Sequence, residues 1–184
     1  MGQHVDSARE RIIDAAEQVV IQLGAGHLTF DAVASKAGVS RGGLLYHFPD
    51  KEALLKGMLD RLIDRLTEGR RRKRAELKQS REREIMAHLL SYLQEGDRTR
   101  RAISAALIAS GAYNPRLLAP LKEKYRKLMD DATLDGMRLE RAAVISLAAD
   151  GLRILEVLSL SPYSEEERVR IVEEMMALAR EGGK

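Results

Sequence analysis

The sequence predicts an all-α protein of about nine helices, with a small three-helix head at the N-terminus and a larger helical bundle as the body. Three observations support this fold class. The chain has four prolines and 4% aromatic residues, and is otherwise rich in Ala, Leu, Glu and Arg. Capping residues recur in front of apolar stripes with helical spacing. No segment reads convincingly as a strand.

The head begins with a capping box, in which Ser7 is followed three residues later by Glu10. An apolar stripe at helical spacing comes next and is ended by glycines. Thr29 can cap a second, short helix, and Ser40 can cap a third helix of about residues 41–47.

A fourth helix follows Pro49, which stops the third, and Asp50, which can cap the new one. Its apolar stripe predicts an end near Gly69, where the basic run RRRKR occupies residues 70–74. Such a run can bind nucleic acid, or it can be the solvated end of a helix, and the sequence alone favours neither interpretation.

The body contains five further helices. They are expected over residues 80–96, 97–112, 114–132 and 138–158, and from a second capping box at Ser164 and Glu167 onward. We therefore divide the chain into a head, residues 1–60, and a body, residues 61–184.

Composition narrows the class of protein. The hydrophobic share of 45% and the charged share of 32% are typical of a soluble globular protein. The absence of cysteine excludes disulfides and thiolate metal sites, and no signal peptide or long apolar run is visible, so we expect a cytoplasmic protein. No metal-ligand spacing, catalytic triad or phosphate-binding glycine loop occurs. We expect no enzyme, no metal and no cofactor.

Residues 29–47 have the pattern of a helix-turn-helix. Ala34 is small enough for the crossing point of two helices, and Gly38 suits a turn that needs a positive φ. Val39 can pack beneath that turn and Leu44 can return to the core. One short helix is thereby left free to enter a groove of DNA.

The stretch TFDAVASKAGVSRGGLLYHFPDKEALL, residues 29–55, resembles the DNA-binding signature of TetR-type (tetracycline-repressor-like) bacterial transcription regulators. The resemblance covers roughly residues 7–60, whereas the body is similar only in its length and helical architecture. It implies a homodimer whose helix-turn-helix heads bind palindromic double-stranded DNA. It also implies that the body binds a small effector, which releases the DNA.

The third helix is the candidate reader of bases. Arg41 is the side chain near its start that can make a bidentate bond to guanine O6 and N7, and Leu45 offers apolar contact. Gly42 and Gly43 would let the backbone approach the base edges, or are simply permissive positions. Lys51 opposes the helix dipole, which a nearby phosphate would explain. The predicted DNA contacts, with Tyr46 and His47 assigned to phosphate by the resemblance, are Thr29, Ser40, Arg41, Gly42, Gly43, Leu45, Tyr46, His47 and Lys51.

The body helices mix large side chains with many small ones, which can leave a cavity for a small, mostly apolar effector, although a filled core is the alternative. The predicted lining is Met86, His88, Leu89, Tyr92, Leu107, Tyr113, Leu121 and Tyr125.

The last two helices carry wide apolar stripes and are expected to pair with their copies across a twofold axis. The predicted dimer interface is Ile145, Leu152, Leu155, Val172 and Met176.

The leading hypothesis is a ligand-responsive DNA-binding repressor. The alternatives are a helical ligand-binding protein or enzyme whose head no longer binds DNA, and a helix-bundle adaptor that binds only protein. Retention on random DNA with a steep salt dependence distinguishes the first from the others.

Overall fold

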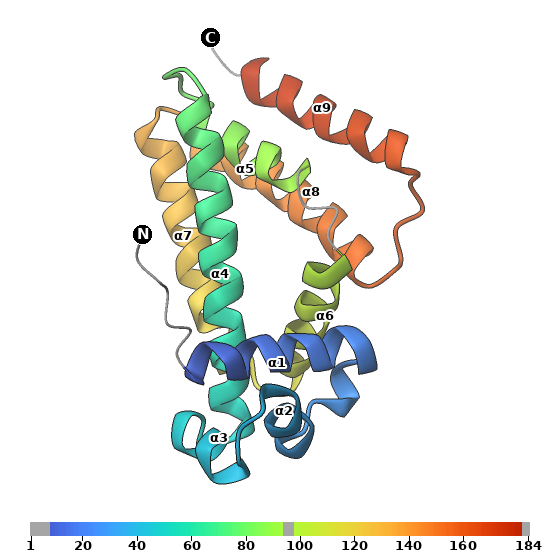
Figure 1. Ribbon diagram of the computed structural model, residues 1–184. Coiled ribbons are helices and arrows are strands. Elements are labelled where there is room, and N and C mark those ends of the chain that lie inside the picture. The colour runs from blue at the N-terminus through green and yellow to red at the C-terminus, as the bar shows by residue number, and fades with distance from the viewer. Residues whose placement is uncertain (1–7, 94–97, 182–184) are drawn as a thin grey trace. The chain divides into compact units, whose positions relative to one another are not determined.

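The computed structural model describes residues 8–93 and 98–181, and within these ranges the chain is all-α, as predicted. Figure 1 labels the α-helices and colours them from blue at the N-terminus to red at the C-terminus. No helix of the described part is long and apolar enough to cross a membrane. The nine α-helices and two 3-10 helices are α1 (Ala8–Leu23), η1 (Ala25–His27), α2 (Phe30–Ala37), α3 (Arg41–His47), α4 (Lys51–Glu76), α5 (Arg83–Leu93), α6 (Arg98–Tyr113), η2 (Pro115–Leu118), α7 (Ala119–Leu134), α8 (Leu139–Val157) and α9 (Glu165–Glu181).

The described helices form two compact units. Unit 1 joins Met1–Leu62 with Arg98–Ala119, so α6 packs with the head and contacts α1. The sequence boundary at residue 60 does not anticipate this, because nothing local to residues 98–119 marks them as partners of α1. The core of unit 1 draws on α1, α3, α4 and α6: Ile12, Ile13, Ala16, Leu44, Phe48, Leu54, Met58, Leu59, Ile103 and Leu107 are buried.

The capping signals of the head act as expected where the structure describes them. The Thr29 hydroxyl accepts a hydrogen bond from the Ala32 amide at 3.2 Å, and the Ser40 hydroxyl accepts one from the Gly43 amide at 3.0 Å. Gly38 has a φ of 65°, the left-handed conformation predicted for the turn. Ser7 lies outside the described residues, so the first capping box is not tested.

Unit 2 joins Ile63–Asp97 with Pro120–Lys184. In it α5 packs against α8 and α9, and α8 packs against α9. Its apolar core draws on α5, α7, α8 and α9: Ile85, Met86, Leu89, Leu128, Ala132, Ala142, Ile145, Ala149, Leu152, Val172, Met175 and Met176. The capping box at Ser164 and Glu167 forms in both directions, with donor–acceptor distances of 2.9 and 3.2 Å.

The predicted end of α4 near Gly69 is wrong, since the helix continues to Glu76. Charged contacts offset the cost of the glycine. Glu68 accepts hydrogen bonds from Arg71 and Arg72, three and four residues further on, and these hold the pKa of Glu68 down at about 2. Lys73 likewise donates to Glu76.

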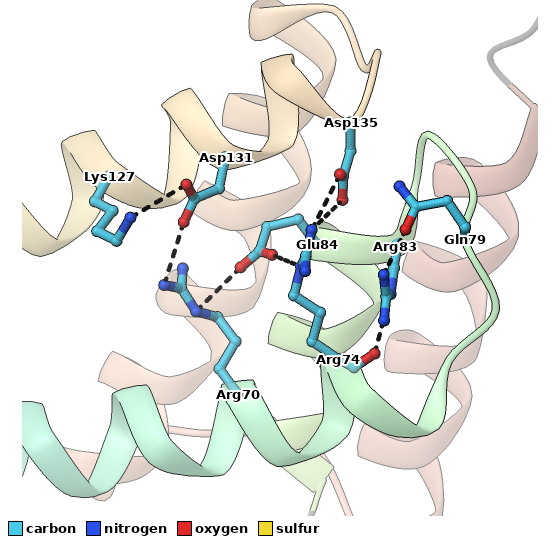
Figure 2. Close-up of polar contacts among 8 residues, drawn as sticks. All are labelled: Arg70, Arg74, Gln79, Arg83, Glu84, Lys127, Asp131 and Asp135. Carbon is cyan, nitrogen blue, oxygen red and sulfur yellow. Dashed lines mark hydrogen bonds and ion pairs between the residues drawn. The ribbon is translucent and has the colours of Figure 1, made fainter.

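Two residues of the basic run, Arg70 and Arg74, extend toward carboxylates of neighbouring segments, as Figure 2 shows. Arg70 pairs with Glu84 at 3.2 Å, and Arg74 pairs with Glu84 at 2.6 Å and with Asp135 at 3.1 Å. Arg70 and Glu84 are buried. We name Arg70, Arg74, Glu84, Asp131 and Asp135 the ion cluster. Asp131 of α7 lies 3.9 Å from Arg70, so the cluster ties α4 to α5 and α7. Two of the five residues of the basic run thus serve packing within this unit.

Candidate nucleic-acid interface

Helix α3 is anchored by one side and exposed on the other. Leu44 is fully buried in unit 1, and Phe48 is buried directly after the helix. Ser40 caps the N-terminus, which fixes the direction of the first turn. The exposed face carries the predicted contacts Arg41, Gly42, Leu45 and Tyr46, and Gly43 and His47 are partly exposed.

Arg41 extends from the first turn of α3 to Asp31 in the first turn of α2. Its Nη1 donates to both carboxylate oxygens of Asp31, at 2.6 and 2.9 Å. Both side chains are largely in solvent, with 62% of Arg41 and 73% of Asp31 exposed. The spacing of residues in the sequence does not predict this pair. Its signal would have been an acidic residue in the first turn of one helix and a basic one in the first turn of the next.

The two adjacent glycines have different surroundings. A Cβ built on Gly43 would come to 3.3 Å from the Ser40 hydroxyl, so a side chain there would press on the capping oxygen. A Cβ on Gly42 would meet nothing closer than the same oxygen at 4.0 Å. Gly43 therefore has a reason within the fold. Gly42 has no such close neighbour among the described residues.

The remaining predicted contacts lie at the ends of helices in unit 1. Tyr46 is 85% exposed and meets His47 edge to face, with ring centroids 5.1 Å apart. The Thr29 hydroxyl accepts from Ala32 and keeps its own proton as a donor. Lys51 is exposed as the first residue of α4. These groups can donate hydrogen bonds to an anion such as phosphate.

A cluster that the sequence analysis missed holds α4 to α1. Arg61 donates to Asp14, to the Glu10 carboxylate at 2.5 Å and to the Glu10 carbonyl at 3.1 Å, and Glu17 lies 3.8 Å away. These carboxylates raise the pKa of Arg61 against the opposing effect of burial. The three acids recur at helical spacing along one face of α1, and that periodicity could have indicated a buried cation.

The predicted effector residues are divided between the two units. Met86, His88 and Leu89 are buried in unit 2, where Leu121 and Tyr125 are more exposed, and Leu107 is buried in unit 1. The side chains of Tyr92 and Tyr113 lie outside the described residues. In unit 2 a hollow of about 360 Å³ lies beside the ion cluster, and its lining shares none of the predicted residues: it consists of Thr67, Arg70, Arg71, Arg74, Glu84, Lys127 and Asp131.

His88 is the centre of a buried polar group in unit 2. Burial lowers the pKa of His88 to about 3, and nearby Arg153, Lys124 and Arg70 lower it further. Its Nε2 has no hydrogen-bond partner among the described residues and lies 4.0 Å from Asp150 Oδ1. Burial raises the pKa of Asp150. Partial burial of Tyr125, which is 39% exposed, and the neighbouring Asp150 raise the pKa of the tyrosine. His88 is therefore neutral at pH 7.

The predicted interface side chains on α8 and α9 lie mainly in the core of unit 2. Ile145, Leu152, Val172 and Met176 are buried in the core of unit 2 by the chain's own helices, and Leu155 is half-buried. The exposed apolar residues of α8 lie on another face. We name this face the α8 stripe: Val144, Leu147, Gly151, Ile154 and Leu158, the last of which caps the helix.

The chain matches two known family models. Residues 12–58 match the one for bacterial regulatory proteins of the tetR family, and residues 82–180 match one for a tetracyclin repressor-like C-terminal domain.

Individual relatives agree with these matches. The HTH-type transcriptional regulator SrpR of Pseudomonas putida is 43% identical over 54 residues, which are 29% of this chain and only 25% of SrpR. The regulator BetI of Pseudomonas fluorescens is 28% identical over 184 residues, covering 92% of this chain and 91% of BetI. The solved structure of the multidrug binding protein EbrR with imidazole has a TM-score of 0.70 at 24% identity, with 94% of each chain covered, and shows the same fold.

Proposed function

This chain belongs to the tetR family of bacterial regulatory proteins, and we propose that it acts in the cytoplasm as a homodimeric repressor. In this proposal the two α3 helices read an inverted repeat in double-stranded DNA. A small, mostly apolar effector bound in the body then releases the protein from its operator.

The observation that carries the proposal is the exposed face of α3. A seven-residue helix whose only buried residue is Leu44, and whose start is fixed by the Ser40 cap, presents Arg41, Gly42 and Leu45 to solvent. A recognition helix places its first residues against base edges in the major groove. Arg41 supplies a bidentate donor for guanine, and Gly42 lets the backbone come close. Thr29, Tyr46, His47 and Lys51 then take phosphates, which position the head without reading sequence.

The α8 stripe supports the homodimer. Leu147 is 71% exposed, and its neighbours Val144 and Ile154 also face solvent in the single chain. Gly151 lies in the middle of the stripe, and a Cβ there would meet nothing within 4 Å. An apolar stripe with a small residue at its centre suits close packing against an identical helix across a twofold axis. An inverted repeat in the operator would mirror that axis.

For the effector we propose a site among the body helices, with His88, Tyr125 and Asp150 supplying polar contacts. His88 offers a neutral imidazole whose Nε2 has no hydrogen-bond partner in the described residues. The effector must bind the DNA-incompetent arrangement more tightly than the competent one, because only a difference in affinity shifts the equilibrium. A thermal-shift screen of apolar compounds, followed by operator release, tests this. A compound that stabilises the protein but leaves operator affinity unchanged contradicts effector control.

The DNA part of the proposal is tested by selection of duplexes from a random pool with the purified protein. We expect an inverted repeat with a guanine in each half-site. Arg41→Ala should cost about 1–3 kcal/mol on the selected sequence and relax the preference at that guanine. Lys51→Ala should weaken binding to all sequences about equally. An unchanged consensus with Arg41→Ala would show that another residue reads the base.

A further inference from the structure

The Arg41 guanidinium is held at one corner and free along one edge. Nη1 bridges the two carboxylate oxygens of Asp31, which reaches it from the neighbouring helix α2. Among the described residues, the hydrogen bonds of Arg41 all come from Nη1, and neither Nε nor Nη2 donates one. The pair is contained within unit 1, so its geometry does not depend on the body.

The free edge has the shape that guanine recognition requires. A guanidinium can present two parallel N–H groups along its Nε–Nη2 edge, and guanine offers two parallel acceptors, O6 and N7, in the major groove. Contact along this edge leaves the Nη1 bonds to Asp31 in place. One arginine can therefore bind the carboxylate and the base at the same time.

We propose that Asp31 is a positioning residue for base reading, which holds Arg41 with its Nε–Nη2 edge toward a guanine. The proposal rests on the proposed function, in which α3 reads the major groove. A free arginine loses much rotamer freedom when it is ordered on a base. An arginine already held at Nη1 loses less, so the carboxylate increases the preference for guanine without touching DNA.

The placement of Asp31 argues for this role over a purely structural one. An ion pair between two such exposed side chains contributes little to folding stability. A carboxylate beside the candidate DNA contacts also repels phosphates and weakens binding to any sequence. From the first turn of α2, Asp31 also complements the helix dipole, which stabilises the helix modestly, but that role does not require contact with Arg41. A gain in selectivity explains why the carboxylate contacts Arg41 although it opposes general DNA affinity.

The experiment uses the full-length protein and the duplex that the wild-type protein selects from a random pool. Affinities are measured by fluorescence anisotropy on that duplex, on the same duplex with the guanine of each half-site replaced by adenine, and on random DNA. The variants are Asp31→Asn, Arg41→Ala and the double variant. Glu52→Gln is the matched control, because Glu52 is an exposed carboxylate in the first turn of α4. Thermal melts verify that each variant is folded.

We expect Asp31→Asn to lower the preference for guanine over adenine by about three- to tenfold, a fraction of what a whole bidentate contact supplies. The loss should vanish in the Arg41→Ala background, which shows that Asp31 acts through Arg41. Asp31→Asn and Glu52→Gln should both tighten binding to random DNA, since each removes a negative charge.

Three outcomes overturn the proposal. If Asp31→Asn tightens binding to all duplexes by the same factor as Glu52→Gln, its carboxylate acts only through charge. If it relaxes a different position of the site and does so without Arg41, Asp31 itself contacts a base. If Asp31→Asn unfolds the head, its role is structural. Failure of the wild-type protein to select any sequence would instead overturn the proposed function.

Discussion

Two pairs with the same chemistry lie in opposite environments in this molecule. Arg41 and Asp31 form an exposed arginine–carboxylate pair at the candidate DNA interface, whereas Arg70 and Glu84 form a buried one in the ion cluster. Water screens the first pair, so breaking it costs little stability and leaves Arg41 able to bind something else. Removing Glu84 from the second pair leaves the buried Arg70 with the more distant Asp131, at 3.9 Å, as its ion-pair partner among the described residues. Burial therefore decides whether such a pair serves binding or folding.

The largest expected effect comes from breaking the buried pair. Glu84→Gln should lower the free energy of unfolding by about 3–5 kcal/mol, because Arg70 and Arg74 lose the carboxylate that they share. Urea unfolding followed by circular dichroism measures the change. Asp31→Asn is the exposed counterpart and should change stability by less than about 1 kcal/mol. Equal losses in the two variants would contradict the contrast between the pairs.

The same contrast applies to apolar residues of α8. Leu147→Glu changes the exposed α8 stripe and should give a folded monomer with operator binding weakened about a hundredfold or more, because the two heads no longer bind together. Leu152→Ala, on the buried face, should cost about 2–5 kcal/mol of stability and leave the dimer intact. Light scattering gives the mass of each variant. A dimeric Leu147→Glu protein would show that the subunits meet elsewhere.

A smaller effect should appear in the pH dependence of stability. Folded His88 binds a proton only near pH 3, whereas an unfolded histidine does so near pH 6.5, so acidification below about 6.5 favours the unfolded chain. The loss between pH 7 and pH 5 should be about 1–2 kcal/mol. Asp150 acts in the opposite sense, because its raised pKa lets the folded carboxyl take up a proton first.

Urea midpoints at the two pH values, for the wild-type protein and for His88→Gln, isolate the contribution of the histidine. Lys124, Arg153, Arg70 and Tyr125 also act on this buried group, and all of them remain in the variant. A wild-type protein whose stability changes no more than that of His88→Gln would contradict the depressed pKa.

The smallest expected effect lies at the start of α3. Ser40→Ala removes the oxygen that caps the Gly43 amide and should cost about 1 kcal/mol, measured by urea unfolding. Ser40→Asp should recover most of this loss, since Asp is also a good capping residue. Recovery of stability without recovery of operator affinity would show that the serine hydroxyl has a second role at the DNA.

The head could be predicted well because its signals are local. A capping serine, a glycine with positive φ and a leucine that returns to the core each act within a few residues of their own position. The predicted end of α4 is wrong because the contacts that continue the helix include a carboxylate on another helix, as with Arg74 and Glu84 of α5. Taken alone, Gly69 predicts the end of the helix.

The spacing of apolar residues does not reveal which face of α8 is exposed. Leu147 and Leu152 look equivalent in a helix that carries apolar residues on several sides, and only the packing of α5 and α9 distinguishes them. The Asp31–Arg41 pair was missed for a related reason. Two exposed residues in different helices have no shared period, so their contact follows from the angle at which α2 and α3 meet.

The grouping of α6 with the head has a consequence for how members of this family could exchange parts. A recombination event between relatives near residue 62 would transfer the DNA-binding helices but leave Ile103 and Leu107, buried in unit 1, to be inherited with the other parent's body. The α1 helix of one parent would then pack against the α6 helix of the other. Viable chimaeras should therefore keep residues 98–119 together with the head they evolved beside, which makes the inherited module discontinuous in the gene.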